Sequence, residues 1–297
     1  MVDCSAARLA LMSDPLDHLA LLQGRRVLRE RLAGGMTNLT WRVRDLDNPA
    51  FDVAVRIAPP SGWPPAHSDE VANHRAAATV GVAPDLLADE PGLMVVAMVP
   101  GGVALTGDDL GQPATIAAAG RLVRQLHDGP ACRGRFDLFE VRRRYLDRAL
   151  RAGRDLDRVD ESTVRRIEAR LATDPAPQVP CHNDLVAANI IDDTQRLWLI
   201  DFEYAAMGEA AFDLGNLWIQ SPMTREDLDT MVKAYSGRTD PELVTRAELW
   251  GVAAGLTWPL WASVTDEMTE GTREWVAEIQ RRARGYASDA EFRARLR

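Results

Sequence analysis

The chain of 297 residues is long enough for two lobes that each bury a hydrophobic core. Apolar residues make up 46% of the sequence and charged residues 27%, which is ordinary for a globular protein. The net charge of −9 argues against nucleic acid or an anionic membrane as the main partner, because both are themselves negatively charged.

The first hundred residues predict a short helix, five strands and a second helix. The short helix is expected over residues 15–23, because Leu16, Leu19 and Leu22 are spaced for one face of an amphipathic helix. Apolar runs and alternation predict the strands, and a Pro/Gly-rich loop precedes the second helix. The expected strands cover residues 27–32, 40–43, 51–57, 86–87 and 93–98, and the second helix covers residues 68–80.

A glycine pair lies between the first two expected strands, in the segment Gly34-Gly35-Met36-Thr37-Asn38. Glycine lets backbone N–H groups come close to a phosphate, so this segment is a candidate phosphate-binding loop. A plain β-turn explains a glycine pair equally well, and Arg56 on a following strand is what favours the phosphate loop. The candidate nucleotide-binding residues of this loop are Gly34, Gly35, Thr37 and Asn38.

The clearest break in composition is Pro100-Gly101-Gly102, which predicts a lobe boundary there. Residues 1–100 would form a nucleotide-binding lobe and residues 101–297 a catalytic and substrate-binding lobe. The expected fold class is α+β, with a small antiparallel-β N-lobe and a larger, mainly helical C-lobe. Helices are expected over residues 114–127, 139–152, 162–172, 212–219, 225–234 and 241 to the end. The basic run Arg142-Arg143-Arg144 predicts a solvated helix face.

A segment between these helices carries the strongest chemical signal. His182, Asp184 and Asn189 follow the pattern His-x-Asp-x-x-x-x-Asn, and a strand-like run over residues 196–200 leads to Asp201. Asp184 could accept a proton from an attacking hydroxyl, while Asn189 and Asp201 offer oxygens to Mg²⁺ bridging nucleotide phosphates. Mg²⁺ prefers oxygen, so His182 is expected to hold the loop rather than bind metal. The alternative is that the His-x-Asp-x-x-x-x-Asn pattern arises by chance in a polar loop. The segment Ile200-Asp201-Phe202-Glu203-Tyr204, which follows shortly after, argues against chance.

Two tryptophans near the C-terminus, Trp258 and Trp261, lie three residues apart and so share one face of an expected helix. Tryptophan is the best cation–π partner among the side chains, so this pair could wall a pocket for an ammonium group. Tyr204, close to Asp201, is a candidate third wall. The alternative is that both tryptophans are core aromatics that pack the helix.

These segments together resemble the choline/ethanolamine kinase branch of the aminoglycoside-phosphotransferase-like, protein-kinase-like superfamily. The resemblance runs from about Leu32 to Tyr286, which is most of the chain. Asn183 precedes Asp184, where the antibiotic-modifying relatives more often have glycine. The segments that match the branch are Gly34 to Asn38, Val55-Arg56-Ile57, Cys181-His182-Asn183-Asp184, Ile200 to Tyr204, and Phe212-Asp213-Leu214-Gly215-Asn216.

The resemblance implies a bilobal protein-kinase-like fold with ATP and Mg²⁺ as cofactors. Arg56 would grip the phosphates, as arginine does in this branch, and this suits a chain whose only lysine is Lys233. Glu70 would be the ion-pair partner of Arg56, and Met98 and Val99 would lie against the adenine. An exposed strand charge is the alternative for Arg56, and a solvated helix residue is the alternative for Glu70.

The resemblance also implies an aromatic pocket for a quaternary ammonium group, walled by Trp258, Trp261 and Tyr204. Gln220 stands where the family tends to carry an acidic residue facing the cation. The aromatic-rich segment that follows in eukaryotic members is absent, since residues 221–225 read Ser-Pro-Met-Thr-Arg. A site with fewer charges and rings holds choline less tightly or prefers another amino alcohol.

The expected function is transfer of the γ-phosphate of MgATP to the hydroxyl of an amino alcohol, with choline or ethanolamine favoured. One alternative is a kinase of the same fold that acts on an aminoglycoside, thiamine or another amine-bearing alcohol. An alternative of another class is a catalytically inactive kinase-like binding protein. Roles of Asp213 and Asn216 beyond structural support are left open.

The expected partner is the small-molecule substrate, with neither nucleic acid nor membrane, and a homodimer is compatible with the sequence. No stretch approaches the roughly 18 apolar residues of a membrane span, and the N-terminus lacks the pattern of a signal peptide. Three widely spaced cysteines imply no disulfide framework or zinc knuckle. These features predict a cytoplasmic protein.

Overall fold

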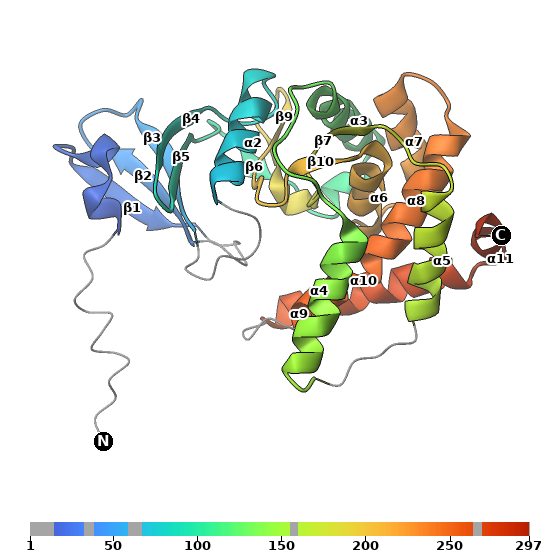
Figure 1. The fold of residues 1–297 in the computed structure, drawn as a ribbon. Helices are drawn as coiled ribbons and strands as arrows, with labels where there is room; N and C mark the ends of the chain where they lie inside the picture. Colours follow the sequence, from blue (N-terminus) through green and yellow to red (C-terminus); the bar gives the residue numbers. More distant parts are fainter. Residues whose placement is uncertain (1–14, 33–38, 59–66, 155–159, 264–268, 297) are drawn as a thin grey trace. The chain divides into compact units, whose positions relative to one another are not determined.

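The computed structural model describes residues 15–32, 39–58, 67–154, 160–263 and 269–296. The chain groups into two compact units, drawn as a ribbon in Figure 1. The first unit holds Met1–Trp63 and Asp85–Met98, and the second holds Pro64–Pro84 and Val99–Arg297. The chain enters the second unit for the last time at Val99, next to the boundary expected near residue 100.

The first unit is built on a five-stranded antiparallel sheet with the order β1-β2-β3-β5-β4. Val53 and Val55 of the central strand alternate with less buried neighbours and face the core, as period-two patterning requires. The five strands expected from the sequence are thereby confirmed. They are β1 (Val27–Arg31), β2 (Leu39–Asp45), β3 (Asp52–Ile57), β4 (Leu86–Glu90) and β5 (Leu93–Ala97).

The helix expected over residues 15–23 is wrong, since this segment forms two short 3₁₀ turns, η1 (Pro15–His18) and η2 (Ala20–Leu22). Leu16, Leu19 and Leu22 are nevertheless buried in the core of the first unit. Their spacing of three residues is the period of a 3₁₀-helix, whereas an α-helix needs a mixture of three and four. The leucine spacing therefore predicts the burial of this segment correctly, whereas the α-helix expected from it is a pair of 3₁₀ turns.

The second unit is mainly helical, which confirms the α+β class. The helices and 3₁₀ turns are α2 (His67–Thr79), η3 (Asp109–Gly111), α3 (Pro113–His127), α4 (Leu138–Arg151), α5 (Glu161–Ala172), η4 (Ala187–Asn189), α6 (Ala210–Gln220), α7 (Arg225–Ser236), α8 (Pro241–Gly255), α9 (Trp258–Ser263), α10 (Glu270–Ser288) and α11 (Ala290–Arg295). The single helix expected from residue 241 to the end is therefore wrong. Leu256 and Thr257 separate α8 from α9: Leu256 is the C-cap of α8, and Pro259 lies in the first turn of α9, where proline is tolerated.

Two small sheets in the second unit present the loop that carries the chemical signal. The strand β7 (Gln178–Cys181) pairs with β10 (Ala206–Glu209) and leads directly into that loop. The strands β8 (Ile190–Asp192) and β9 (Leu197–Leu199) form a hairpin between the loop and Asp201, and β6 (Val103–Ala104) extends it. Two separate sheets thus fix the two ends of the segment.

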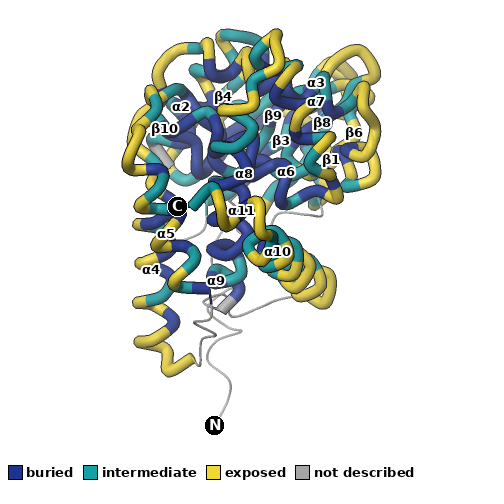
Figure 2. The backbone as a smooth tube through the Cα atoms, turned by 90° about the vertical axis from the view of Figure 1, so that its right-hand side faces the viewer, coloured by how far each residue is buried: buried dark blue, intermediate teal, exposed yellow. Residues whose placement is uncertain are grey.

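The helices α6 and α8 cross at the centre of the second unit, and Figure 2 shows both as largely buried. Glycines permit the crossing: a Cβ on Gly215 would lie 2.1 Å from the carbonyl oxygen of Ala247. A Cβ on Gly251 would lie 2.6 Å from the oxygen of Gly215. Such distances are far inside van der Waals contact, so both positions exclude a side chain. The backbones of α6 and α8 are therefore in direct contact.

The helix α2 groups with the second unit rather than with the sheet that flanks it in sequence. The buried Asn73 donates to the carbonyl oxygens of Ala205 (2.6 Å) and Arg133 (3.2 Å), and it accepts from the Arg133 N–H (2.6 Å). His74 contacts the ring of Phe202 edge-on at 5.3 Å. These long-range bonds explain the grouping, which the local sequence pattern does not carry.

The expected solvated face Arg142-Arg143-Arg144 is wrong for its first residue. Arg142 is buried, donates to the Leu256 carbonyl at 2.5 Å and pairs with Glu161 at 3.2 Å. Arg143 and Arg144 are exposed as expected. Helical geometry turns successive residues by about 100°, so three consecutive arginines cannot share one solvated face.

Among the residues that the structure describes, no helix is both long enough and apolar enough to cross a membrane. Cys132 and Cys181 are free, buried thiols. Cys4, the third cysteine, lies outside the described residues.

Candidate active site

The loop after β7 is held in an uncommon backbone conformation. Asn183 has φ of 63° and Asp201 has φ of 67°, both in the left-handed region. Asparagine and aspartate tolerate this region better than other residues with a side chain. Non-glycine residues in this region cluster at functional sites, where surrounding bonds must hold them in place. Asn183 directly precedes Asp184, and Asp201 is itself a candidate metal ligand; a third residue with such a backbone, Thr194, lies in the β8–β9 turn.

Asp213 of α6 supplies those bonds. Its carboxylate is fully buried and accepts the backbone N–H of His182 at 2.8 Å and that of Asn183 at 2.7 Å. It also faces His127 of α3, whose Nε2 lies 3.0 Å from Oδ2. Charge-assisted bonds of this kind are among the stronger hydrogen bonds in proteins. Asp213 therefore fixes the start of the loop against α6.

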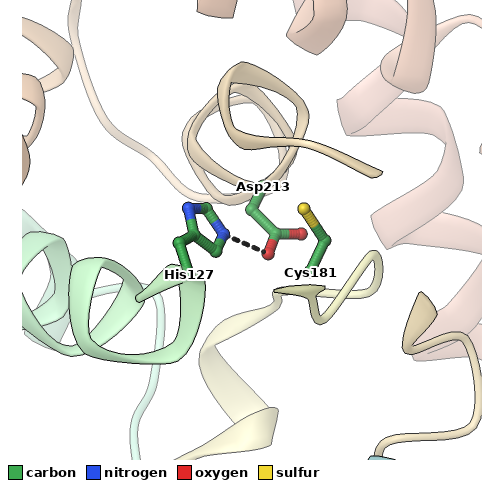
Figure 3. A group of neighbouring side chains, drawn as sticks. All are labelled: His127, Cys181 and Asp213. Atoms are coloured by element: carbon green, nitrogen blue, oxygen red, sulfur yellow. Dashed lines mark hydrogen bonds and ion pairs between the residues drawn. The ribbon is translucent and has the colours of Figure 1, made fainter. Parts of the chain in front are cut away.

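The buried group His127, Cys181 and Asp213 has the composition of a metal site, and Figure 3 shows the three side chains converging. Their ligand atoms lie within 4.8 Å of one another. The Asp213 oxygens already accept N–H groups, and the second ring nitrogen of His127 lies 3.0 Å from the Tyr235 hydroxyl. Burial raises the pKa of the Cys181 thiol well above its ordinary value, so it stays protonated. These bonds make the group a structural brace for the loop.

His182 joins the loop to the strand that precedes Asp201. Its Nε2 lies 2.8 Å from the carbonyl oxygen of Ile200, and its Nδ1 accepts the Asp184 N–H at 3.3 Å. A carbonyl only accepts and a backbone amide only donates, so the ring is neutral with its proton on Nε2. The ring also contacts Phe202 at 4.9 Å. His182 thus holds the loop, as the sequence predicted.

The structure brings Asn189 to Asp184. The amide nitrogen of Asn189 donates to the Asp184 carbonyl at 2.9 Å and approaches its carboxylate at 3.5 Å. The Asn189 carbonyl accepts the N–H of Ile200, the residue before Asp201, at 3.0 Å. The amide nitrogen is therefore committed to Asp184, which leaves the amide oxygen Oδ1 as the group able to coordinate a metal ion.

Asn216 of α6 lies between the loop and α9. Its amide nitrogen donates to the Leu185 carbonyl at 3.1 Å. Its amide oxygen accepts the indole N–H of Trp258 at 2.7 Å and the amide N–H of Gln220 at 2.9 Å. Three residues singled out by the sequence are thereby joined in one buried network.

The candidate aromatic walls are only partly assembled. The rings of Tyr204 and Trp258 lie edge-on at 5.9 Å, and both residues are largely buried. The Tyr204 and Tyr145 hydroxyls are 3.2 Å apart, and burial together with Tyr145 raises the pKa of Tyr204 well above its ordinary value. Trp261 lies one turn further along α9 and is half-buried. Tyr204 is tied to the loop as well, because Asn183 donates to its carbonyl at 3.0 Å.

The candidate nucleotide-binding residues are distributed over both units. Gly34, Gly35, Thr37 and Asn38 lie outside the described residues. Arg56 is on β3, opposite Thr40 and Met94, and the Met98 N–H donates to the Asp52 carbonyl at 3.1 Å. Glu70 is in the first turn of α2, and the Val99 carbonyl accepts the Gly102 N–H at 3.0 Å. The Arg56–Glu70 ion pair stays a prediction, because the two residues belong to different units.

Sequence reasoning missed His127 and Tyr145, and it left open any role of Asn216 beyond structural support. His127 meets Asp213 across 86 residues, and Tyr145 meets Tyr204 across 59. No local pattern marks either residue, because a histidine at a helix end and a tyrosine on a helix face are common core residues. A search for buried polar residues in the expected helices would have singled out Asn216.

Solved structures that resemble this protein have a protein-kinase-like fold. A choline/ethanolamine kinase family protein from Mesorhizobium loti has a TM-score of 0.80 and 26% identity, covering 98% of this chain and 97% of the other. The choline kinase LicA from Streptococcus pneumoniae has a TM-score of 0.71 and 22% identity, covering 87% of this chain and 92% of the other. At that identity the second likeness shows the fold alone. The fold class expected from the sequence is confirmed.

The family follows from the sequence comparison. The model of the phosphotransferase enzyme family matches residues 29–250, and the chain belongs to this family. Protein LicA of Haemophilus influenzae is 29% identical over 98 residues, which are 31% of this chain and 37% of that protein. The chain thus matches little more than a third of the length of that curated relative.

Proposed function

We propose that this protein is a kinase that transfers the γ-phosphate of MgATP to the hydroxyl of an amino alcohol, with choline or ethanolamine favoured. The observation that carries the proposal is the loop of Asp184 and Asn189, which Asp213 braces and which Asn216 joins to Trp258. Chemistry and ammonium recognition would therefore share one framework. Membership of the phosphotransferase family supports the reaction, and the resemblance to choline/ethanolamine kinases supports the substrate class.

Asp184 would orient the attacking hydroxyl and accept its proton. A carboxylate suits this task because phosphoryl transfer mainly requires positioning of the nucleophile. The Asp184 N–H is held by His182, and its carbonyl is held by Asn189. The carboxylate therefore stands on a backbone that is fixed on both sides.

Asn189 and Asp201 would hold Mg²⁺. Both offer oxygen, the ligand atom that Mg²⁺ prefers, and the bond from Asn189 nitrogen to Asp184 fixes which atom of the amide is available. A bound Mg²⁺ would neutralise charge on the phosphates as it builds up. Asp201 has a left-handed backbone and lies two residues after the end of the strand β9.

Arg56 would grip the phosphates, assisted by the loop of Gly34, Gly35, Thr37 and Asn38. Arginine stays charged at every physiological pH and binds phosphate oxygens through two N–H groups at once. Glu70 would position Arg56. Met98 and Val99 would contact the adenine through the backbone.

Tyr204, Trp258 and Trp261 would bind the ammonium group of the substrate through the faces of their rings. The network around Asn216 fixes the orientation of Gln220. Since Gln220 donates its N–H to Asn216, its amide oxygen is left as a neutral acceptor for the substrate side. A neutral acceptor attracts a permanent cation less strongly than a carboxylate does, and it accepts the N–H of a primary amine.

A panel of amines tests the proposal. ATP consumption would be measured with choline, ethanolamine, their methylated intermediates, thiamine and aminoglycosides, each against a no-amine blank. Turnover with an amino alcohol at the highest kcat/KM is the expected result. A higher kcat/KM with thiamine or an aminoglycoside would overturn the substrate class. No consumption with any amine, together with no thermal shift from MgATP, would favour a binding protein instead.

A further inference from the structure

The Asn216 amide is the junction of two segments that are far apart in sequence. On one side it donates to the carbonyl of Leu185, the residue directly after Asp184. On the other side it accepts the indole N–H of Trp258 on α9. Asn216 is fully buried, so water cannot take the place of either partner.

The orientation of this amide follows from the chemistry of its partners. A backbone carbonyl can only accept a hydrogen bond, so the group that faces Leu185 must be the NH₂ of Asn216. An indole N–H can only donate, so the group that faces Trp258 must be the oxygen. Both ends demand the same orientation, and a flipped amide would lose both bonds at once.

We propose that Asn216 is a positioning residue that couples the Trp258 ring to the catalytic loop. The Trp258 ring would contact the ammonium group, as in the proposed function on which this inference rests. A displacement of that ring pulls on the Asn216 oxygen, and the rigid amide passes the displacement to Leu185 and the adjoining Asp184. Asn216 itself touches neither the reacting atoms nor the phosphates.

The rigid setting of Asn216 makes this coupling effective. It lies on α6 one residue after Gly215, where the backbone is in direct contact with α8. Asp213, three residues earlier on α6, holds the start of the same loop. The loop is therefore fastened to α6 at two points, and only the second point also contacts the aromatic side.

Hydrogen exchange on the full chain tests the coupling without any substrate. Trp258→Phe keeps an aromatic ring and removes the indole N–H together with part of the ring system, a truncation that the control below reproduces. We expect the peptide covering residues 181–189 to exchange about threefold faster or more in this variant, because its protected amides open more often. Asn216→Ala should give the same increase, and the double variant Asn216→Ala/Trp258→Phe should exchange no faster than Asn216→Ala alone.

The matched control is Trp250→Phe, which removes another indole N–H of the same unit, one that donates to Glu209 at 2.8 Å. It should leave the exchange of residues 181–189 unchanged. Unchanged exchange in Trp258→Phe, or additive increases in the double variant, would overturn the coupling. Trp258→Phe decides the question by itself if Asn216→Ala does not fold.

Kinetics with the amine identified by the panel separate positioning from simple structural support. Asn216→Ala should raise the KM of the amine and lower kcat, each about tenfold, with an unchanged KM for ATP. A lower melting temperature with unaltered kinetic constants would show a structural role only and overturn the inference. An inactive wild-type protein would refute the proposed function, whereas the exchange experiment would still decide the coupling.

Discussion

The catalytic loop and the aromatic side of the candidate site are held by different kinds of bonds. The loop is fastened to the carboxylate of Asp213, which accepts two backbone N–H groups. The aromatic side is fastened to the neutral amide of Asn216, which accepts from Trp258 and Gln220. Charge-assisted bonds are roughly twice as strong as neutral ones. Substitutions on the aromatic side should therefore change substrate choice at a smaller cost than substitutions in the loop.

The largest effect is expected at Asp184. Asp184→Asn should lower kcat about 10²- to 10⁴-fold, because the amide cannot accept the proton of the substrate hydroxyl. Its melting temperature should stay close to that of the wild type. Steady-state ATP consumption and thermal unfolding measure the two quantities. The matched control is Asp192→Asn, which can still accept the Thr194 N–H in the β8–β9 turn. Near-normal turnover by Asp184→Asn would contradict its assignment as the base.

The second effect concerns the anchor of the loop. Asp213→Asn replaces an acceptor of several N–H groups by an amide whose NH₂ must face another N–H group. We expect a loss of about 3 kcal/mol in the free energy of unfolding, together with a fall in kcat, because buried partners are left unsatisfied. Urea denaturation measures the loss. The control is Asp128, which is exposed and forms a surface ion pair with Arg124. Asp128→Asn should change the free energy of unfolding by less than about 1 kcal/mol. An equal loss of unfolding free energy in Asp213→Asn and Asp128→Asn would contradict the role of Asp213 as the anchor of the loop.

The aromatic side should respond more weakly. Trp261→Ala removes one proposed cation–π contact, so the KM of the amino alcohol should rise about fivefold, with kcat nearly unchanged. Kinetics at saturating ATP measure the split between KM and kcat. If Trp261 is a core residue only, the variant loses stability and keeps its KM.

The smallest effect is a pH dependence of stability that arises from the buried thiols of Cys132 and Cys181. Burial raises the pKa of Cys132 to about 12 and that of Cys181 well above its ordinary value. A thiol in the unfolded chain titrates near pH 8.5, so the native state keeps protons that the unfolded state releases. The stabilisation is complete below about pH 8.5 and is lost as the pH rises from there toward the native pKa values.

Unfolding between pH 8.5 and 9.5 should therefore show a declining free energy, with a slope of at most about 1.4 kcal/mol per pH unit for each thiol. Cys132→Ser removes one titrating group and should flatten the slope relative to the wild type. An unchanged slope would mean that the Cys132 thiol ionises equally easily in the folded and unfolded chains.

Sequence patterns predicted the parts of this molecule that local chemistry determines. The strands of the first unit follow from alternation, while the roles of Asp184, Asn189 and Asp201 in phosphoryl transfer stay predictions. The 3₁₀ turns that hold Leu16 and Leu22 were not predicted, because the same spacing fits either helix type when only three leucines define it.

What the sequence did not provide are bonds between distant segments. Asn73 joins α2 to Ala205, and Asn216 joins Leu185 to Trp258, yet nothing in the local sequence shows which distant residue either amide contacts. Such contacts are decided by which helices meet, and helix–helix approach depends on tertiary packing rather than on any short motif. The sequence therefore shows that these asparagines are present, but it does not predict which distant residues they contact.

The contact of Gly215 with Gly251 has a consequence for how the protein would lose activity on heating. The catalytic loop is fastened to α6, and α6 touches α8 backbone to backbone. A partial melting that spared this helix pair would leave the loop in place, while separation of the pair would release loop and core together. Activity that is lost through release of the loop should therefore follow the unfolding curve of the second unit rather than precede it.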